Sequence, residues 1–332
     1  MKTRRTFLTT TAAVSGLAML EHAFAWPQGD TGRVEPRAMT AAEFHASRAF
    51  VDTRFGRIAY VERGKGPVAV FLHGLPLSGF QWRGAIPRLA GLRRCLAPDF
   101  PGLGYTEAKP DQDLSPVAQA EAIVAFLDAL KVASADVVAS DSGGGVAQLL
   151  AAREPKRVRT LLLTNCDVHT NSPPALMAPQ VEAARKGVLA DGLAQHVADK
   201  TFARSAEGIG GACYTSPVNP TDEAIDYYFQ PILSTPARRA QLHRYVLSFE
   251  PNPLPAIEPA LKRSEVPVRM VWGTGDKFFD VTWADWLDRT FPRSRGVRRV
   301  EGAKLFFPEE MPEVVAEEAR ALWSDASPEG LT

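Results

Sequence analysis

Residues 137–147 read VVASDSGGGVA, and this stretch decides the fold. The mostly apolar run from Ala135 to Ala139 predicts a buried strand, and the run from Gly144 to Arg153 predicts a helix that begins directly after a tight turn. A strand, a sharp turn and a helix in this order predict a nucleophile elbow, in which a strained turn lifts one side chain out of the sheet.

The register of small residues in this stretch selects the raised side chain. The strand and helix backbones pass close together at such a turn, so small residues must flank it, as Ala139 and Gly143 do. Counting two residues forward from Ala139 and two back from Gly143 arrives at Asp141. Ser142 lies one position later, so the sequence predicts an aspartate nucleophile rather than a serine.

Apolar runs and helical spacings alternate along most of the chain. Such alternation predicts a mostly parallel sheet with right-handed crossovers and helices on both faces. Residues 171–266 are instead broken by prolines and show no strand alternation, so they are interpreted as an inserted helical cap. The expected strands are 49–53, 57–62, 68–72, 94–98, 135–139, 160–164, 268–272 and 296–300, and the expected helices are 80–89, 116–130, 144–153, 283–291 and 308–323.

Length and charge limit the classes of partner. The chain has 332 residues, which accommodates one large α/β domain with an inserted lobe, or two ordinary domains. It carries 38 basic and 38 acidic side chains, so neither nucleic acid nor an anionic membrane is expected as a partner. Cys95, Cys166 and Cys213 are too few and too scattered for a disulfide framework or a zinc site, although the sequence leaves a single bridge open.

The first residues have the pattern of an export signal. The letters TRRTFL at 3–8 resemble a twin-arginine motif, and a short apolar stretch and the small-x-small site Ala23-Phe24-Ala25 follow. The expected protein is therefore periplasmic or secreted, with no membrane segment after cleavage. The expected organisation is a signal peptide (1–25), a surface leader (26–48), a first core segment (49–170), the cap (171–266) and a second core segment (267–332).

Four landmarks in this order resemble the α/β-hydrolase superfamily, most closely its haloalkane dehalogenase and epoxide hydrolase branch. They are HGLP at 73–76 with Trp82 six residues beyond, PDFPGLG at 98–104, the Asp141 elbow, and WGTGD at 272–276. The resemblance extends over essentially all of the chain after residue 25. It implies an α/β-hydrolase fold with an inserted cap, a small-molecule substrate, and no cofactor or metal.

The resemblance assigns a role to each matching residue. Asp141 matches the nucleophile, and Asp276 matches the acid that orients a catalytic histidine. The backbone N–H groups of Leu75 and Ser142 match the oxyanion hole. Further pocket residues implied in this way are His73, Trp82 and Leu305.

An aspartate nucleophile restricts the chemistry. Attack by a carboxylate on a saturated carbon that carries a halide or an epoxide oxygen gives a stable alkyl ester on the enzyme. Water then attacks this ester, and the oxyanion hole stabilises the tetrahedral intermediate. The expected substrate is therefore a small apolar halide, epoxide or ester-like molecule. In the resembling families the base for the water step is a histidine.

That histidine is missing here. Residues 302–310 read GAKLFFPEE, where the family has a motif such as GAGHFFPEE, so Leu305 stands at the histidine position. Leucine can neither accept a proton nor bind Asp276, and a general base contributes about 10²–10⁴-fold to a rate. Candidate replacements are His169, His196 and His243, and Asp167 is a second candidate for the orienting acid.

Three hypotheses follow from these departures. The first is a hydrolase that forms a covalent alkyl-enzyme at Asp141. The second is a catalytically degenerate binding protein on the same scaffold, and the third is a serine hydrolase that uses Ser142, against the register of the elbow. Leu75 and Ser142 also stand where dehalogenases commonly place N–H groups that hold the halide. Cap tyrosines that would protonate an epoxide oxygen are Tyr214, Tyr227, Tyr228 and Tyr245, while the oligomeric state stays open.

Overall fold

The computed structural model describes residues 36–325. The expected signal peptide (1–25) and residues 26–35 of the expected leader lie outside the described residues, so the export prediction stays a prediction. Residues 36–325 contain one eight-stranded sheet in the order β1-β2-β4-β3-β5-β6-β7-β8. The strands are β1 (Arg48–Thr53), β2 (Gly56–Arg63), β3 (Val68–Leu72), β4 (Arg94–Pro98), β5 (Ala135–Asp141), β6 (Val158–Cys166), β7 (Val268–Gly273) and β8 (Ser294–Val300).

The sheet is mostly parallel. The first two strands form an antiparallel hairpin, and β2 pairs antiparallel with β4. From β4 through β3, β5, β6 and β7 to β8 every pairing is parallel. All residues of β3 and β5 are buried, as expected for central parallel strands that helices cover on both faces. The predicted fold class is confirmed, and the predicted bounds of β3 and β4 match those observed.

Helices pack on both faces because the chain reverses its direction along the sheet. From β3 the chain crosses to β4 on one side, and from β4 it returns past β3 to β5 on the other. Right-handed crossovers therefore place α2 (Ala85–Leu89) on one face, and α3 (Pro116–Ala129) and α4 (Ser142–Arg153) on the opposite face. The last helix, α14 (Pro312–Asp325), contacts α2, while α12 (Val281–Thr290) packs against β7 and β8.

Two expected helices are each divided in the structure. The segment 80–89 consists of the 3₁₀ turn η1 (Gly79–Trp82) and the helix α2, and the segment 308–323 consists of α13 (Phe307–Glu310) and α14. The second division has a simple cause. Pro312 has no N–H to donate and is accommodated where a helix begins, so α14 starts at this residue.

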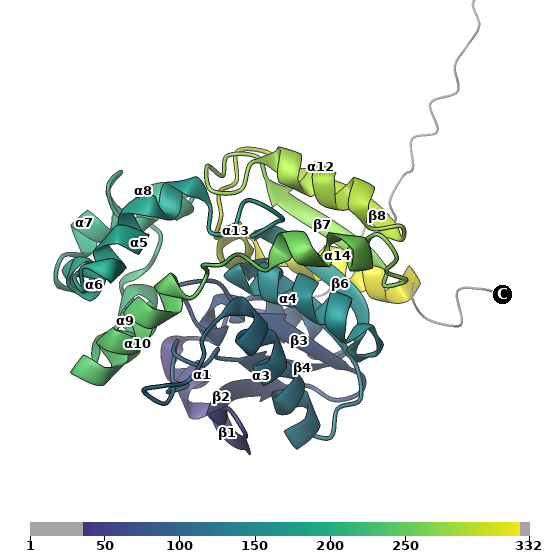
Figure 1. Cartoon of the computed structure of the whole chain (residues 1–332), viewed down its shortest axis with the longest axis horizontal. Helices are drawn as coiled ribbons and strands as arrows, with labels where there is room; N and C mark the ends of the chain where they lie inside the picture. Colours follow the sequence, from purple (N-terminus) through teal and green to yellow (C-terminus); the bar gives the residue numbers. More distant parts are fainter. Residues whose placement is uncertain (1–35, 326–332) are drawn as a thin grey trace, which may run out of the picture. The chain divides into compact units, whose positions relative to one another are not determined.

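Helices gather beyond the carboxyl ends of the strands, on the left of Figure 1. Residues 171–266 are all described and contain helices and turns between β6 and β7. The last two short elements of this segment, η4 (Leu254–Ile257) and α11 (Glu258–Leu261), contact α4 of the core. We refer to the remaining helices of this segment as the cap helices: α5 (Ala178–Arg185), α6 (Leu189–Ala198), α7 (Lys200–Arg204), α8 (Ile209–Cys213), α9 (Asp222–Leu233) and α10 (Pro236–Leu247).

The expected surface leader is partly wrong. Its second half forms α1 (Ala41–Ala46), which begins with a capping box between Thr40 and Glu43. Met39 and Phe44 are buried, and the Phe44 ring makes an edge contact with Phe80, at 5.3 Å between ring centroids. This segment belongs to the folded core because Phe44 packs against Phe80 and against Tyr227 of α9.

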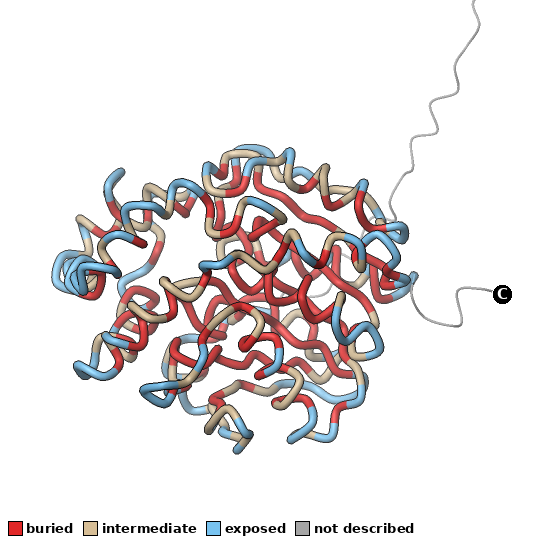
Figure 2. Tube along the Cα trace, viewed as in Figure 1, coloured by how far each residue is buried: buried red, intermediate tan, exposed pale blue. Residues whose placement is uncertain are grey.

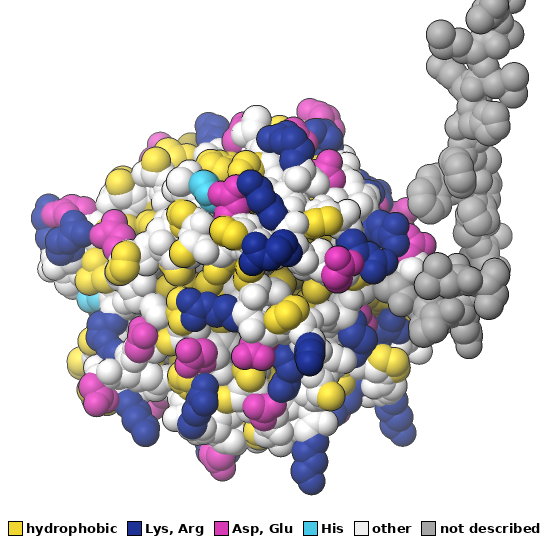
Figure 3. Space-filling model, turned by 45° about the vertical axis from the view of Figure 1, so that its right-hand side comes forward, with side chains coloured by type: hydrophobic (Ala, Val, Ile, Leu, Met, Phe, Trp, Pro, Cys, Tyr) yellow, Lys and Arg dark blue, Asp and Glu magenta, His cyan; other side chains and the backbone are white. Residues whose placement is uncertain are grey.

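Buried residues run along the strands and the inner helix faces in Figure 2. Cys95, Cys166 and Cys213 are all buried and all free thiols. On the face shown in Figure 3, the acidic and basic side chains of the described residues are interspersed. Among residues 36–325 no helix combines the length and the apolar character needed to cross a membrane.

Candidate active site

The elbow lies at the junction of β5 and α4. Asp141 ends β5 with φ +53° and ψ −132°, whereas Ser142 is the first residue of α4. A positive φ is costly for a residue with a side chain, and the surrounding structure has to hold it in place. The strained position of this turn is therefore Asp141, as the register of small residues predicts.

Three glycines make room for the turn. A Cβ atom at Gly74 would lie 2.3 Å from Asp141 Oδ2, and one at Gly143 would lie 2.4 Å from the carbonyl oxygen of His73. A Cβ atom at Gly144 would lie 2.2 Å from the Cβ of Cys166. Real Cβ atoms do not approach other atoms this closely, so these positions exclude any larger residue unless the backbone moves.

Backbone N–H groups hold the raised carboxylate. The N–H of Leu75 donates to Asp141 Oδ2 at 2.9 Å. The N–H of Ser142 also donates to this carboxylate, and both hydrogen bonds favour its charged form and so lower its pKa. The two groups that the resemblance assigns to an oxyanion hole thus already face the side chain that would carry the ester.

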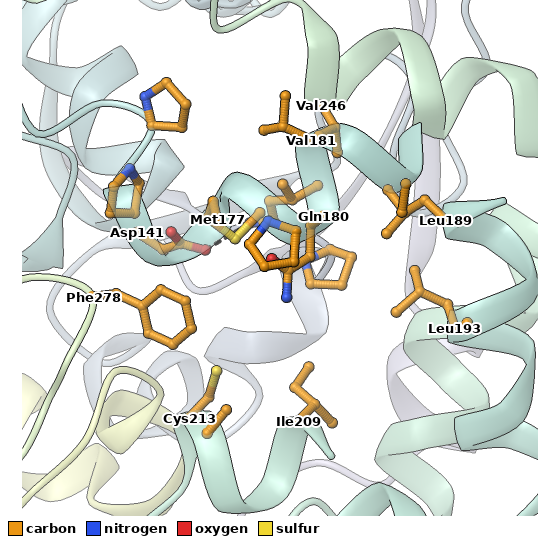
Figure 4. A pocket seen from close by; sticks show the side chains of 18 of the residues that line it. Asp141, Met177, Gln180, Val181, Leu189, Leu193, Ile209, Cys213, Val246 and Phe278 are labelled. Carbon is orange, nitrogen blue, oxygen red and sulfur yellow. Dashed lines mark hydrogen bonds between the residues drawn. The ribbon is translucent and has the colours of Figure 1, made fainter. Parts of the chain in front are cut away.

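Asp141 opens onto a cavity of about 380 Å³ between the core and the cap. The cavity is lined mainly by apolar side chains, and Figure 4 shows Asp141 on one wall with Phe278 and Cys213 beside it. Leu75, Ser142, Asp167 and Leu305 also line the cavity. Leu189 and Leu193 lie across the view from Asp141 in Figure 4. Other lining residues of this segment include Met177, Gln180, Val181, Ile209 and Val246.

Two expected pocket residues lie elsewhere. His73 and Trp82 are fully buried and are not among the described residues that line the cavity, so their prediction as pocket residues is wrong. The Nε2 of His73 accepts from the Phe100 N–H at 3.1 Å, and its ring stacks at a tilt on Phe100. His73 thus ties the loop after β3 to the loop after β4, while Trp82 packs against Phe71.

Asp276 keeps its place after β7 but has no histidine to orient. Its Oδ2 accepts from the Asn165 side chain and its Oδ1 accepts from the Phe278 N–H, both at 2.9 Å. Burial raises the pKa of Asp276 to about 6, against these hydrogen bonds. Asp276 is not among the described residues that line the cavity, whereas Leu305 is.

The candidate replacement histidines are engaged elsewhere. The Nε2 of His169 pairs with Glu258 at 3.0 Å, and the Nε2 of His243 accepts from the Ala190 N–H at 3.1 Å. His196 lines the cavity, but its Nδ1 pairs with the Gly192 carbonyl at 3.0 Å and its Nε2 accepts from the Ile209 N–H at 3.2 Å. Within residues 36–325, no histidine makes a hydrogen bond to Asp141.

Three of the four cap tyrosines are engaged away from the cavity. The hydroxyls of Tyr214 and Tyr228 donate to Glu309 at 3.0 and 2.7 Å, and Tyr227 bonds to Arg48. Burial raises the pKa of Tyr245, and a hydrogen bond with the Ser142 side chain opposes this shift. None of these four tyrosines is among the described residues that line the cavity.

Three buried carboxyl groups lie near one another at this end of the sheet. Burial and the neighbouring Asp167 and Asp276 carboxyls raise the pKa of Asp141 well above its usual range. Burial raises the pKa of Asp167 to about 7, against a hydrogen bond with Ser172. The one nearby lysine of the motif, Lys304, directs its Nζ to the Gly211 carbonyl at 2.7 Å, away from Asp141.

Sequence reasoning missed most of the cavity wall. Phe278 and Cys213 face Asp141 in Figure 4, yet neither belongs to a motif. The cap residues carry no signal of their own, because their apolar side chains would equally suit a helix core. The tertiary structure alone brings them opposite the elbow.

A family model described as the alpha/beta hydrolase fold matches residues 67–310. A haloalkane dehalogenase of Mesorhizobium japonicum is 45% identical over 102 residues, which cover 30% of this chain and 33% of that protein. The chain thus matches this curated relative over about a third of its length. A hydrolase of Saccharomyces cerevisiae is 26% identical over 242 residues, covering 69% of this chain and 81% of that protein.

Solved structures show the same fold. An ancestral haloalkane dehalogenase superimposes with a TM-score of 0.65 at 26% identity, over 83% of this chain and 99% of that chain. An epoxide hydrolase superimposes with a TM-score of 0.68 at 22% identity, over 84% of this chain and 99% of that chain. At these identities the likeness establishes the architecture, and the site has to be judged from its own residues.

Proposed function

Because the chain belongs to the alpha/beta hydrolase fold family, we propose that it is a hydrolase that forms a covalent alkyl-enzyme at Asp141. The observation that carries this proposal is the strained Asp141 on the wall of an apolar cavity, with the Leu75 N–H 2.9 Å from its Oδ2. The substrate class is a small apolar halide, epoxide or ester-like molecule, since the cavity of about 380 Å³ is lined mainly by apolar side chains.

The geometry suits attack on a saturated carbon. One carboxylate oxygen of Asp141 is held by the Leu75 N–H, and the carboxylate attacks the carbon that carries the leaving group. The resulting ester is neutral, so its formation relieves the burial of a negative charge at Asp141. Water attack then creates an oxyanion that can accept hydrogen bonds from the N–H groups of Leu75 and Ser142.

Intact-protein mass tests this proposal. The chain from residue 26 onward is incubated with a panel of haloalkanes and epoxides and quenched in acid at a series of times. The expected result is an added alkyl or hydroxyalkyl mass on Asp141 that is absent from Asp141→Asn. Neither adduct nor alcohol product with any member of the panel would count against alkyl-enzyme chemistry.

A second candidate is a binding protein that keeps the cavity without turnover. The observation in its favour is Leu305, which lines the cavity at the place where the family has its histidine. Ligands of a binding protein should raise the unfolding temperature equally in the unaltered chain and in Asp141→Asn, without any change in mass. A mass change that requires Asp141 would exclude this candidate.

The serine hydrolase hypothesis has less support. Ser142 has the backbone of a first helical residue, and its N–H rather than its hydroxyl is directed at Asp141. Ser142→Ala should therefore leave the adduct at Asp141 in place. Loss of all activity in Ser142→Ala, with activity retained in Asp141→Asn, would favour the serine instead.

A further inference from the structure

Asp167 and Asp141 enter the cavity from neighbouring strands. Asp141 ends β5 and pairs with Cys166 at the end of β6, so Asp167 follows directly beside it. The Asp167 N–H donates to the Asp141 carbonyl oxygen at 3.3 Å. Both side chains line the same cavity, and neither is more than 8% exposed.

The Asp167 carboxyl has an oxygen without a partner. Within the described residues its Oδ1 is fully buried and makes no hydrogen bond. Its Cβ lies in van der Waals range of Gly145, in the first turn of α4, where a Cβ atom would approach to 3.1 Å. A buried polar atom of this kind costs free energy when it stays unsatisfied, and the cost is smaller for a neutral, protonated carboxyl group than for a carboxylate.

We expect the two carboxyl groups to share one negative charge. Two charged carboxylates that are neighbours in a buried site repel each other, so one of them keeps its proton. The charge is favoured on Asp141, because the N–H groups of Leu75 and Ser142 donate to it. Asp167, with an oxygen that receives no donor, is the group that retains the proton.

Resting on the proposed function, we propose that Asp167 is the proton donor and acceptor of Asp141, and that the pair selects epoxides over alkyl halides. An epoxide oxygen needs a proton when its ring opens, whereas a halide leaves as an anion without one. The hydroxyls of Tyr214 and Tyr228 are bound to Glu309. Two other carboxyl groups line the cavity, and Asp167 is the buried one beside Asp141, whereas Glu207 is exposed.

In the first step the Asp141 carboxylate attacks an epoxide carbon. The carbon–oxygen bond of the ring breaks, its electron pair goes to the ring oxygen, and this oxygen takes the proton of Asp167. The products are a neutral hydroxyalkyl ester on Asp141 and a charged Asp167. The single negative charge has moved from one carboxyl group to the other, so the buried site keeps the same net charge throughout.

In the second step Asp167 is the base that accepts a proton from the attacking water, a role that Leu305 cannot fill. Water attacks the carbonyl carbon of the ester and gives one proton to Asp167, while the N–H groups of Leu75 and Ser142 stabilise the oxyanion. Collapse of the intermediate breaks the bond to the alkoxide, which recovers that proton from Asp167 as the diol leaves. Asp141 is left as a carboxylic acid that shares one proton with Asp167, as at the start.

A matched pair of substrates tests the role of Asp167. Hexene oxide and hexyl bromide carry chains of similar length, and the quenched mass of the protein measures the rate of ester formation from each. In Asp167→Asn, ring opening of hexene oxide should fall by about 10²-fold or more, because the proton donor is lost. Ester formation from hexyl bromide should stay within about threefold, and that ester should persist instead of being hydrolysed.

Two variants and a pH profile separate a chemical role from a structural one. Asp167→Glu retains a carboxylic acid and should recover part of the epoxide reaction. Asp276→Asn removes a buried carboxyl group that does not line the cavity. It should therefore change the rates of ester formation from the two substrates by the same factor. Ring opening should follow a bell-shaped pH profile, whereas alkylation by the bromide should rise with pH to a plateau.

The outcomes distinguish this inference from the proposed function. If Asp167→Asn slows both substrates equally or slows neither, Asp167 is not the proton donor, although an Asp141 ester would still support the alkyl-enzyme. If neither substrate forms an ester or a product in any variant, the proposed function itself fails, and the inference with it. Selective loss of epoxide opening, with a persistent ester from the bromide, supports both.

Discussion

The Asp141 elbow and the turn at 302–305 lie at the ends of different strands. A single substitution can remove a functional side chain from the turn, whereas the elbow is built from backbone geometry. The elbow depends on backbone geometry: a positive φ, three close glycines and two N–H donors around one carboxylate. In the turn after β8 the positive φ falls on a glycine, Gly302, and the Gly275 N–H donates to the Ala303 carbonyl oxygen at 2.9 Å. Leucine therefore replaces the family's histidine without disturbing the fold.

The same comparison extends to electrostatics. A histidine at position 305 would place a group that can become cationic beside the carboxyls of Asp141 and Asp276. With Leu305 there, those carboxyls and that of Asp167 lie in a buried site where no described salt bridge involves them. Burial raises the pKa of all three carboxyl groups, and the charges of Asp167 and Asp276 raise that of Asp141 further. Groups with raised pKa values can themselves carry protons near neutral pH.

The largest effect is expected from removing the elbow carboxylate. Asp141→Asn should lower ester formation by at least about 10⁴-fold, because no other group of the elbow can form the alkyl ester. Time-resolved intact mass with hexyl bromide measures it, and Ser142→Ala is the matched control at the adjacent position. A rate within tenfold of the unaltered chain would mean that the elbow does not supply the nucleophile.

The next largest effect is expected from introducing a histidine at position 305. Leu305→His should accelerate hydrolysis of the Asp141 ester by about 10²–10⁴-fold, since it supplies a general base beside Asp276. Product release in single-turnover experiments measures this rate, and Leu305→Met controls for the change in packing. The gain should largely disappear in the double variant with Asp276→Asn, and a gain that persists there would mean that Asp276 does not orient the new histidine.

A smaller effect concerns stability and pH. The pKa of Asp167 is raised to about 7 in the folded protein, so the native state binds its proton more tightly than the unfolded chain. This group therefore lowers the free energy of unfolding as pH rises from about 4 through about 7, by roughly 4 kcal/mol in total. Urea unfolding of the unaltered chain and of Asp167→Asn at about pH 5 and about pH 8 measures the difference. The variant should gain relative stability at the higher pH, and an equal difference at both values would contradict a raised pKa.

The smallest effect is expected in the cap. Tyr214→Phe and Tyr228→Phe should change ring opening of an epoxide by less than about twofold, because both hydroxyls donate to Glu309 and not into the cavity. Each should cost about 1 kcal/mol of stability, since buried Glu309 loses a donor. A loss of ring opening comparable with that of Asp167→Asn would place the proton donor in the cap instead of at the elbow.

The fold was largely predictable because its central strands are continuous apolar runs. Strands β3 and β4 have the expected bounds, and the elbow lies where small residues flank Asp141. The predictions were wrong where packing, and not the local sequence pattern, decides the structure. Residues 39–46 resemble a surface leader in sequence, yet Met39 and Phe44 are buried, and the helix expected at 308–323 is divided before Pro312.

The site was predictable to the extent that motifs define it. The sequence indicated Asp141, Leu75, Ser142 and Leu305, all of which line one cavity. It also misplaced His73, because a residue inside a motif can serve the loops of the site without facing the substrate. His73 accepts from the Phe100 N–H and so connects the loop after β3 to the loop after β4.

The sequence by itself determined the register of the elbow and the absence of a histidine at position 305, since both depend on neighbours along the chain. The tertiary structure decided whether another group takes the vacant role. His196 lines the cavity with both ring nitrogens occupied, whereas Asp167 lines it and has one buried oxygen without a hydrogen bond. These facts depend on which backbone groups fold against each side chain, and a pattern of residue types does not encode hydrogen-bond partners that lie far away along the chain.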